Sequence, residues 1–193
     1  MGRLWIVSDT HFGHANIINY ANRPFDSLEE MNDELIRRWN ERVKPADSVI
    51  HLGDFCFKNS AGGKSGEGDL KDSEYYLKQL NGRVTILEGN HDAHNSVRSH
   101  IKSIVLDYGR KNIFCVHNPV DANFEYELNL VGHVHRNWKI KEYDDAEKTG
   151  KRGWIINCGV DIWDFRPITV EEIFALVAQK ERKYDKPTIE KTL

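Results

Sequence analysis

The sequence predicts an α/β protein with a mixed β-sheet, and two recurring patterns support this prediction. Short apolar runs of strand length recur along the chain, and segments with helical spacing of apolar residues lie between them. Such alternation is typical of α/β architectures, and the hairpin-like spacing of the later runs favours a mixed sheet. We expect a single domain over residues 1–180 and a charged, disordered tail over residues 181–193.

Six apolar runs are predicted as strands because they are short and rich in Ile, Val, Leu or aromatic residues. They are Leu4–Val7, Ser48–Leu52, Val84–Leu87, Asn112–Val116, Leu128–Val131 and Trp154–Asn157. Most of these runs lead directly into polar residues. The predicted strand ends therefore carry the candidate site.

The clearest helix lies between the first two runs, where apolar residues from Leu28 to Val43 recur at helical spacing. Ser27 is a suitable N-cap, with Glu30 at the capping-box distance, and Pro45 ends the helix soon afterwards. We predict two further helices over residues 70–80 and 169–179.

A glycine- and serine-rich segment at residues 60–68 is predicted as a flexible loop. Whether the surrounding loop, residues 56–69, closes over a site as a lid is left open by its composition.

Charge and cysteine content exclude several classes of protein. The net charge of −3 gives no global field to attract nucleic acid or an anionic membrane, and no stripe of basic and aromatic residues indicates a nucleic-acid interface. The three cysteines, Cys56, Cys115 and Cys158, are too far apart for a CxxC motif and do not indicate a disulfide framework. The first apolar run is too short for a signal peptide or a membrane span. We therefore expect a cytoplasmic protein.

Five polar clusters follow the predicted strands and contain ligand types suited to metal ions. In chain order they are Asp9-Thr10-His11, Gly53-Asp54, Gly89-Asn90-His91-Asp92, His117 and Gly132-His133-Val134-His135. Carboxylate, imidazole and amide groups without thiolates suit Mn, Fe, Zn, Ni or Co. Taken singly, each cluster is as well explained by a turn or a structural histidine. Together they offer more ligands than one tetrahedral site needs, and they match two sites that share a bridging carboxylate.

The motifs DxH, GD, GNHD, H and GHxH, in this order, resemble those of the calcineurin-like metallophosphoesterase family. The resemblance implies a four-layer sandwich of two mixed β-sheets flanked by helices, with two divalent metal ions. Manganese is the first expectation, and Fe, Zn, Ni or Co are alternatives. By the same resemblance, the first metal is held by Asp9, His11 and His135, the second by Asn90, His117 and His133, and Asp54 bridges the two.

The resemblance also implies hydrolysis of a phosphomonoester or a phosphodiester by a hydroxide that bridges the two metals. His91 is then the proton donor to the leaving oxygen, and Asp92 orients its imidazole. His14 lies close enough to His11 in the sequence to contact substrate. Arg23 is a second candidate for a substrate contact, and a salt-bridged role at the surface is at least as good an alternative.

The substrate is expected to be small and phosphorylated, and a nucleotide is one candidate. Protein phosphatases of the family commonly carry Asp-Arg-Gly after the GD motif, whereas this chain continues with Phe55-Cys56-Phe57. The rival interpretation is a binding module like the retromer subunit of this fold, whose metal site is degenerate; here every expected ligand is present. A hydrolase for a non-phosphate ester is a third possibility. The sequence leaves the native metal, the preference for monoesters or diesters and the oligomeric state open.

Overall fold

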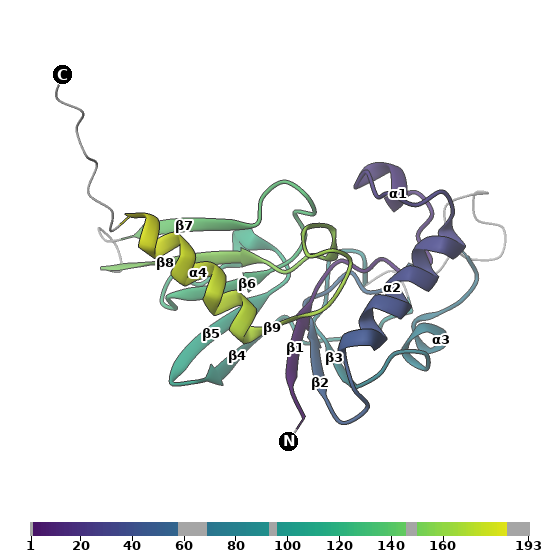
Figure 1. Ribbon diagram of the computed structural model, residues 1–193, viewed down its shortest axis with the longest axis horizontal. Helices are drawn as coiled ribbons and strands as arrows, with labels where there is room; N and C mark the ends of the chain where they lie inside the picture. The colour runs from purple at the N-terminus through teal and green to yellow at the C-terminus, as the bar shows by residue number, and fades with distance from the viewer. Residues whose placement is uncertain (1, 58–68, 93–95, 146–149, 185–193) are drawn as a thin grey trace.

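Two mixed β-sheets form the centre of the protein, as a computed structural model shows (Figure 1). The structure describes residues 2–57, 69–92, 96–145 and 150–184. Within these residues the first sheet has the strand order β3-β2-β1-β9 and the second has the order β4-β5-β6-β8-β7. The strands of the first sheet are β1 (Leu4–Val7), β2 (Ser48–His51), β3 (Arg83–Ile86) and β9 (Ile168–Thr169). Those of the second are β4 (Ser103–Tyr108), β5 (Lys111–Val116), β6 (Leu128–Val131), β7 (Ile140–Asp145) and β8 (Lys151–Asn157). The expected sandwich of two mixed sheets is confirmed.

The central strands of each sheet run parallel, and the antiparallel strands lie at the edges. β1, β2 and β3 are parallel and β9 pairs antiparallel with β1. In the second sheet β5, β6 and β8 are parallel, while β4 and β7 are the antiparallel edges. Because parallel strands end at the same edge of a sheet, the polar clusters that follow β1, β2, β3, β5 and β6 gather at two neighbouring edges.

All six predicted strands are present, and three strands lie outside the prediction. β7 has the sequence IKEYDD, whose charges are common on an edge strand but hide the apolar alternation of a strand. β4 is an edge strand of half-buried and exposed residues, and β9 has two residues only. β4 and β7 pair with the strands that follow them, β5 and β8, whereas β9 pairs with β1, which is distant in sequence.

The structure describes four α-helices, and the predicted helix between the first two strands is confirmed. The helices are α1 (Ile17–Tyr20), α2 (Leu28–Arg42), α3 (Ser73–Leu77) and α4 (Val170–Tyr184). The Ser27 side chain accepts a hydrogen bond from the Glu30 backbone, at 3.1 Å, as predicted for the N-cap of α2. α3 is shorter than the predicted 70–80. Across the described part of the chain, no helix has both the length and the apolar composition that crossing a bilayer requires.

Helix α4 extends further than predicted. A reciprocal capping box fixes its start: Thr169 accepts from the Glu172 backbone at 3.2 Å, and the Glu172 carboxylate accepts from the Thr169 backbone at 2.8 Å. The helix continues to Tyr184, so the prediction that the tail begins at residue 181 is wrong. Residues 180–184 are charged but contain good helix formers, and charge alone does not end a helix. Residues 185–193 lie outside the described residues.

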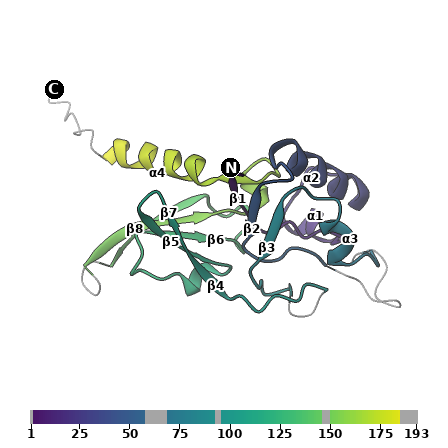
Figure 2. The ribbon, with the colours of Figure 1, turned by 90° about the horizontal axis from the view of Figure 1, so that it is seen from below.

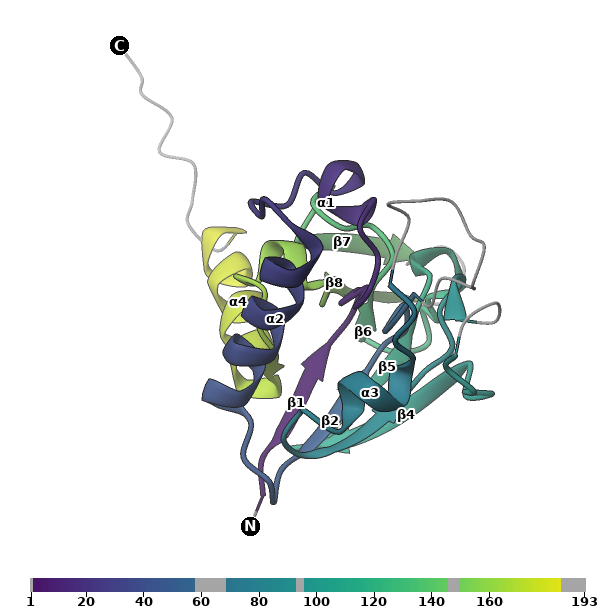
Figure 3. The same ribbon diagram turned by 90° about the vertical axis from the view of Figure 1, so that its right-hand side faces the viewer.

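Buried apolar side chains pack on both faces of the first sheet. On β1, Trp5 and Val7 pack with residues of α2 and α3, whereas Ile6 packs with β5, β6 and β8 in the space between the two sheets. Figures 1 and 2 both place α1–α3 beside the first sheet and α4 alongside the second. Figure 3 shows α2 beside α4, and an ion pair of Arg42 with Glu172, 2.9 Å long, joins the end of α2 to the start of α4.

Candidate metal centre

The seven predicted ligands all follow strands of the two sheets. Asp9 and His11 follow β1, Asp54 follows β2 and Asn90 follows β3, and the remaining three follow β5 and β6. Backbone hydrogen bonds join these strand ends: the His11 N–H donates to the Asp54 carbonyl at 3.0 Å, and the Gly132 N–H to the His117 carbonyl at 2.9 Å. Each of these bonds joins two strand ends of one sheet, and the His133 N–H, which donates to both Asp9 carboxylate oxygens at 3.0 Å, connects the two sheets.

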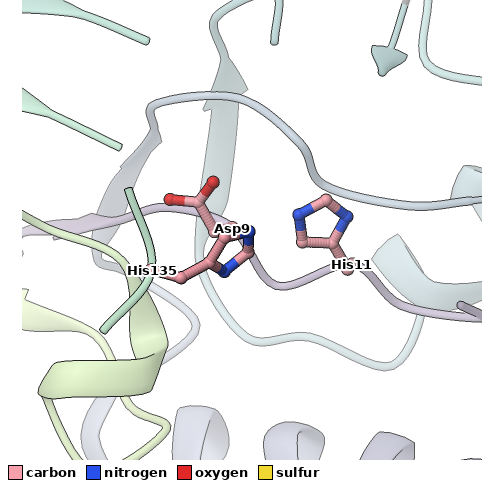
Figure 4. Close-up of side chains that lie close together, drawn as sticks. All are labelled: Asp9, His11 and His135. Carbon is pink, nitrogen blue, oxygen red and sulfur yellow. The ribbon is translucent and has the colours of Figure 1, made fainter. Parts of the chain in front are cut away.

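A first group of ligands consists of Asp9, His11 and His135. Each offers one ligand atom, and these atoms all lie within 4.8 Å of one another. Figure 4 shows the Asp9 carboxylate beside the two imidazoles. The His11 and His135 rings are stacked, with centroids 5.3 Å apart. These three residues are the ones expected to hold the first metal.

A second group consists of Asp54, His117 and His133, whose ligand atoms also lie within 4.8 Å of one another. The amide oxygen of Asn90 lies 2.9 Å from His117 Nε2 and 2.8 Å from His133 Nδ1. Asn90 therefore joins this group, and the residues expected to hold the second metal also come together.

Asp54 lies between the two groups. Its Oδ2 atom is 3.7 Å from His11 Nε2 in the first group and 3.3 Å from His117 Nε2 in the second. Its other oxygen, Oδ1, accepts a hydrogen bond from the His91 backbone N–H at 2.9 Å. One carboxylate oxygen thus faces both groups, which is the position that a bridging ligand requires.

The electrostatics of these groups fit divalent cations. Burial disfavours the charged form of Asp54, but the hydrogen bond from His117 and the charge of His11 outweigh burial and hold its pKa below the usual value. Burial lowers the pKa of His117, but Asp54 and Asp9 outweigh it and raise that pKa to about 9. Burial raises the pKa of Asp9. Among the described residues, the buried Nε2 of His11 has no hydrogen-bond partner. Buried carboxylates beside a nitrogen without a partner are what a divalent ion would stabilise.

Five of the seven candidate ligands have left-handed backbone conformations, which are uncommon outside glycine. The φ angles, all positive, are 57° at Asp9, 51° at His11, 56° at Asp54, 70° at His133 and 45° at His135. Each such residue costs on the order of 1 kcal/mol. Tight turns at the strand ends impose these angles and direct the side chains toward one another.

Two glycines of the motifs are needed because the strand ends approach closely. A Cβ atom on Gly89 would lie 2.2 Å from Asp54 Oδ1, and one on Gly132 would lie 2.0 Å from Ser8 Oγ and 2.6 Å from Asp9 Oδ2. The glycines of the GN and GH motifs therefore leave room for the two carboxylates.

A Gly132→Ala substitution tests this close approach. We expect it to displace the Asp9 carboxylate, to weaken metal binding and to lower the free energy of unfolding by roughly 1–3 kcal/mol. Gly109→Ala is the control, because Gly109 has a φ of +60° but no atom within 4 Å of the added Cβ. Metal titration and thermal melts of both variants give the comparison, and unchanged metal binding in Gly132→Ala would contradict the steric argument.

His91 and Asp92 differ in exposure and in role. His91 is exposed, and its ring centroid lies 5.7 Å from that of His11, at the rim of the first group. Asp92 is buried, and its carboxylate accepts backbone N–H groups of Asp54 at 2.8 Å, Gly89 at 2.9 Å and Phe55 at 3.1 Å. These bonds assign Asp92 to the loop that positions Asp54. That it also orients the His91 imidazole stays a prediction.

His14 lies beside the first group, as predicted from its position in the sequence. Its ring centroid is 5.7 Å from that of His11, and it stacks on Phe57 at 4.5 Å. Burial, together with the charges of His91 and Arg23, lowers its pKa to about 4, so the imidazole is neutral at physiological pH. A contact with substrate stays a prediction.

Arg23 does not face a substrate, and its predicted contact with substrate is wrong. Its guanidinium is buried and donates to Asp161 Oδ1 at 2.9 Å and Oδ2 at 3.2 Å. It also donates to the backbone carbonyls of Thr10 at 2.8 Å and Asp9 at 2.7 Å, and to the Met31 sulfur. These bonds occupy its donors. The ion pair of the alternative role is present, but it is buried instead of lying at the surface as expected.

Asp161, which holds Arg23, was not among the predicted site residues. It lies in the 3-10 helix η3 (Val160–Ile162), and its Oδ2 atom is 2.8 Å from His135 Nδ1. Like the predicted ligands, it follows an apolar run, residues 154–157. A search for polar residues after apolar runs could therefore have found Asp161, although Cys158-Gly159-Val160 separate it from the end of its run.

The proposed lid cannot be placed, because residues 58–68 of the 56–69 loop lie outside the described residues. Its two described ends are anchored near the first group: the Phe57 N–H donates to the Phe12 carbonyl at 2.8 Å, and the Asp69 N–H donates to the Gly13 carbonyl at 3.1 Å.

Comparison with known proteins agrees with this geometry. Residues 3–164 match the calcineurin-like phosphoesterase superfamily domain. An uncharacterized protein of Methanocaldococcus jannaschii is 33% identical over 178 residues, which are 92% of this chain and 92% of that protein. A solved structure of a protein of unknown function from Aquifex aeolicus has the same fold, with a TM-score of 0.62 and 23% identity, over 91% of this chain and 100% of that one. The chain therefore belongs to the calcineurin-like phosphoesterase superfamily.

Proposed function

We propose that the protein is a dinuclear metal-dependent phosphoesterase that hydrolyses a small phosphomonoester or phosphodiester, with nucleotides among the candidates. The position of Asp54 Oδ2 between the two ligand groups carries this proposal, since it lies 3.7 Å from one imidazole and 3.3 Å from another. A structural role for these side chains would not require two groups that share one carboxylate.

The residues of the site would hold the metal ions, position the ester and transfer a proton. Asp9 and Asp54 would place two negative charges against two divalent ions, which leaves a net positive site suited to a phosphate. When bound, such ions neutralise charge on phosphate oxygens and lower the pKa of water. Asn90 and His91 are exposed, so an incoming ester can reach the second group and the imidazole of His91. His91 would protonate the leaving oxygen.

Several finer features are proposed on chemical grounds alone. Manganese is the preferred ion because carboxylate, amide and imidazole ligands suit it, although Fe, Zn, Ni and Co remain compatible. A cytoplasmic location fits three free, buried cysteines.

The proposal predicts metal-dependent hydrolysis. Wild-type protein is expected to cleave para-nitrophenyl phosphate or bis-para-nitrophenyl phosphate with added Mn²⁺ and to lose this activity with a chelator. The preferred substrate distinguishes a monoesterase from a diesterase. Absence of both turnover and bound metal would favour the binding-module interpretation, and turnover of carboxylate esters alone would favour a different hydrolase.

A further inference from the structure

A buried line of three side chains leads from the first ligand group into the protein. His135 Nδ1 contacts Asp161 Oδ2 at 2.8 Å, and Asp161 contacts Arg23 at 2.9 Å and 3.2 Å. The side chains of Arg23 and Asp161 are 0% exposed. Neither reaches solvent or a substrate, so any role in the site must act through other residues.

Asp161 determines which nitrogen of His135 is available. A carboxylate only accepts hydrogen bonds, so the proton of the imidazole lies on Nδ1, facing Asp161. Nε2 is then left for the space shared with Asp9 and His11. A carboxylate that takes the other N–H of a ligating histidine fixes its ring orientation and raises its basicity.

Arg23 connects the other two members of the same group. Its guanidinium donates to the Asp9 carbonyl at 2.7 Å and to the Thr10 carbonyl at 2.8 Å, on the turn that leads to His11. One side chain thus ties this turn to Asp161. In the part of the chain that the structure describes, no hydrogen bond joins Arg23 or Asp161 to the second group.

We propose that Arg23 and Asp161 are positioning residues for the first metal site, and that they set its affinity without touching the ion. The proposal rests on the dinuclear centre proposed above. The competing interpretation is a buried ion pair that only stabilises the fold.

Stepwise binding of Mn²⁺ to the metal-free, full-length protein separates these interpretations. Calorimetric titration of the wild type is expected to give two binding steps, and Asn90→Ala should identify the step of the second site. In Asp161→Asn we expect the affinity of the first site to fall roughly 10–100-fold and that of the second to change less than about twofold. Arg23→Met is expected to act in the same direction.

Loss of one partner of a buried pair can unfold the protein, so a double variant is needed. Arg23→Met/Asp161→Leu removes both charges and replaces them with apolar side chains, which often restores stability. We expect its melting temperature to recover relative to the single variants, while the first site stays weak. Arg42→Met is the matched control: it breaks the ion pair with Glu172 between α2 and α4, so it should lower the melting temperature and leave both affinities unchanged.

Two results with the variants would overturn the proposal. One is a double variant that regains the first-site affinity together with its stability, since the pair would then be structural only. The other is equal weakening of both sites. A wild type that binds two ions but hydrolyses no ester contradicts the proposed function and leaves this assignment intact, whereas a wild type that binds no ion overturns both.

Discussion

We expect Asp54→Ala to lose paired metal binding and to hydrolyse its preferred ester on the order of 10³-fold more slowly than wild type, because bound ions contribute several kcal/mol to the transition state. Asp54 is the residue whose loss affects both groups, since its Oδ2 faces His11 and His117 together. Each of the other six candidate ligands is expected to hold one metal only.

Metal analysis and steady-state kinetics of Asp54→Ala check this expectation. Asp54→Asn is an informative companion, since it keeps the shape and the acceptor for the His91 backbone but removes the charge. Asp164→Ala serves as the control, because its side chain is 76% exposed and belongs to neither group. Two tightly bound ions in Asp54→Ala, with a rate within tenfold of wild type, would rule out a bridging role for this carboxylate.

The residues that come together at the site were predictable because their signal is local. Each ligand lies within a few residues of the end of a short strand, and in a sheet with parallel strands such positions meet at one edge. Asp9 after β1 and Asp54 after β2 are examples: each side chain is buried at the end of a strand, where a charged residue would otherwise be costly.

Contacts between distant segments were not predictable. Arg23 and Asp161 are 138 residues apart, and neither neighbourhood indicates that an ion pair joins them. Asp92 illustrates a different difficulty, because the sequence places it beside His91 while the turn directs its carboxylate to the backbone of Asp54. The left-handed conformations of the ligands belong to the same class: the sequence carries aspartate and histidine where the backbone geometry alone would favour glycine.

That disagreement is physically informative. Sequence and local conformation agree in most of a fold, and departures concentrate at functional sites, where the surrounding structure holds strained residues in place. Here the hydrogen bonds of the strand ends do so: the His133 N–H donates to both Asp9 carboxylate oxygens at 3.0 Å, and the His11 N–H donates to the Asp54 carbonyl. Hydrogen bonds within the protein thus support the uncommon conformations of the candidate ligands.

His91→Ala is expected to retain both metals but to slow hydrolysis of esters with a poor leaving group by roughly 10²–10⁴-fold, the usual contribution of a general acid. The substitution leaves the hydrogen bond from His91 to Asp54 in place, because that bond uses the backbone N–H, which alanine keeps. The effect should depend on the leaving group. A para-nitrophenolate departs without a proton, so its rate should fall much less than that of an alkyl ester.

The measurement is the ratio of kcat/KM for aryl and alkyl esters in wild type and in His91→Ala, together with metal content. His100→Ala is the control, since His100 is an exposed histidine beyond the GNHD motif. Equal loss on both esters, with metals retained, would assign His91 to phosphate binding instead of proton transfer. No loss of rate on the alkyl ester would show that His91 is not the proton donor. The proton would then have to come from solvent or from another residue. His14 is a poor candidate, because its imidazole is buried and neutral.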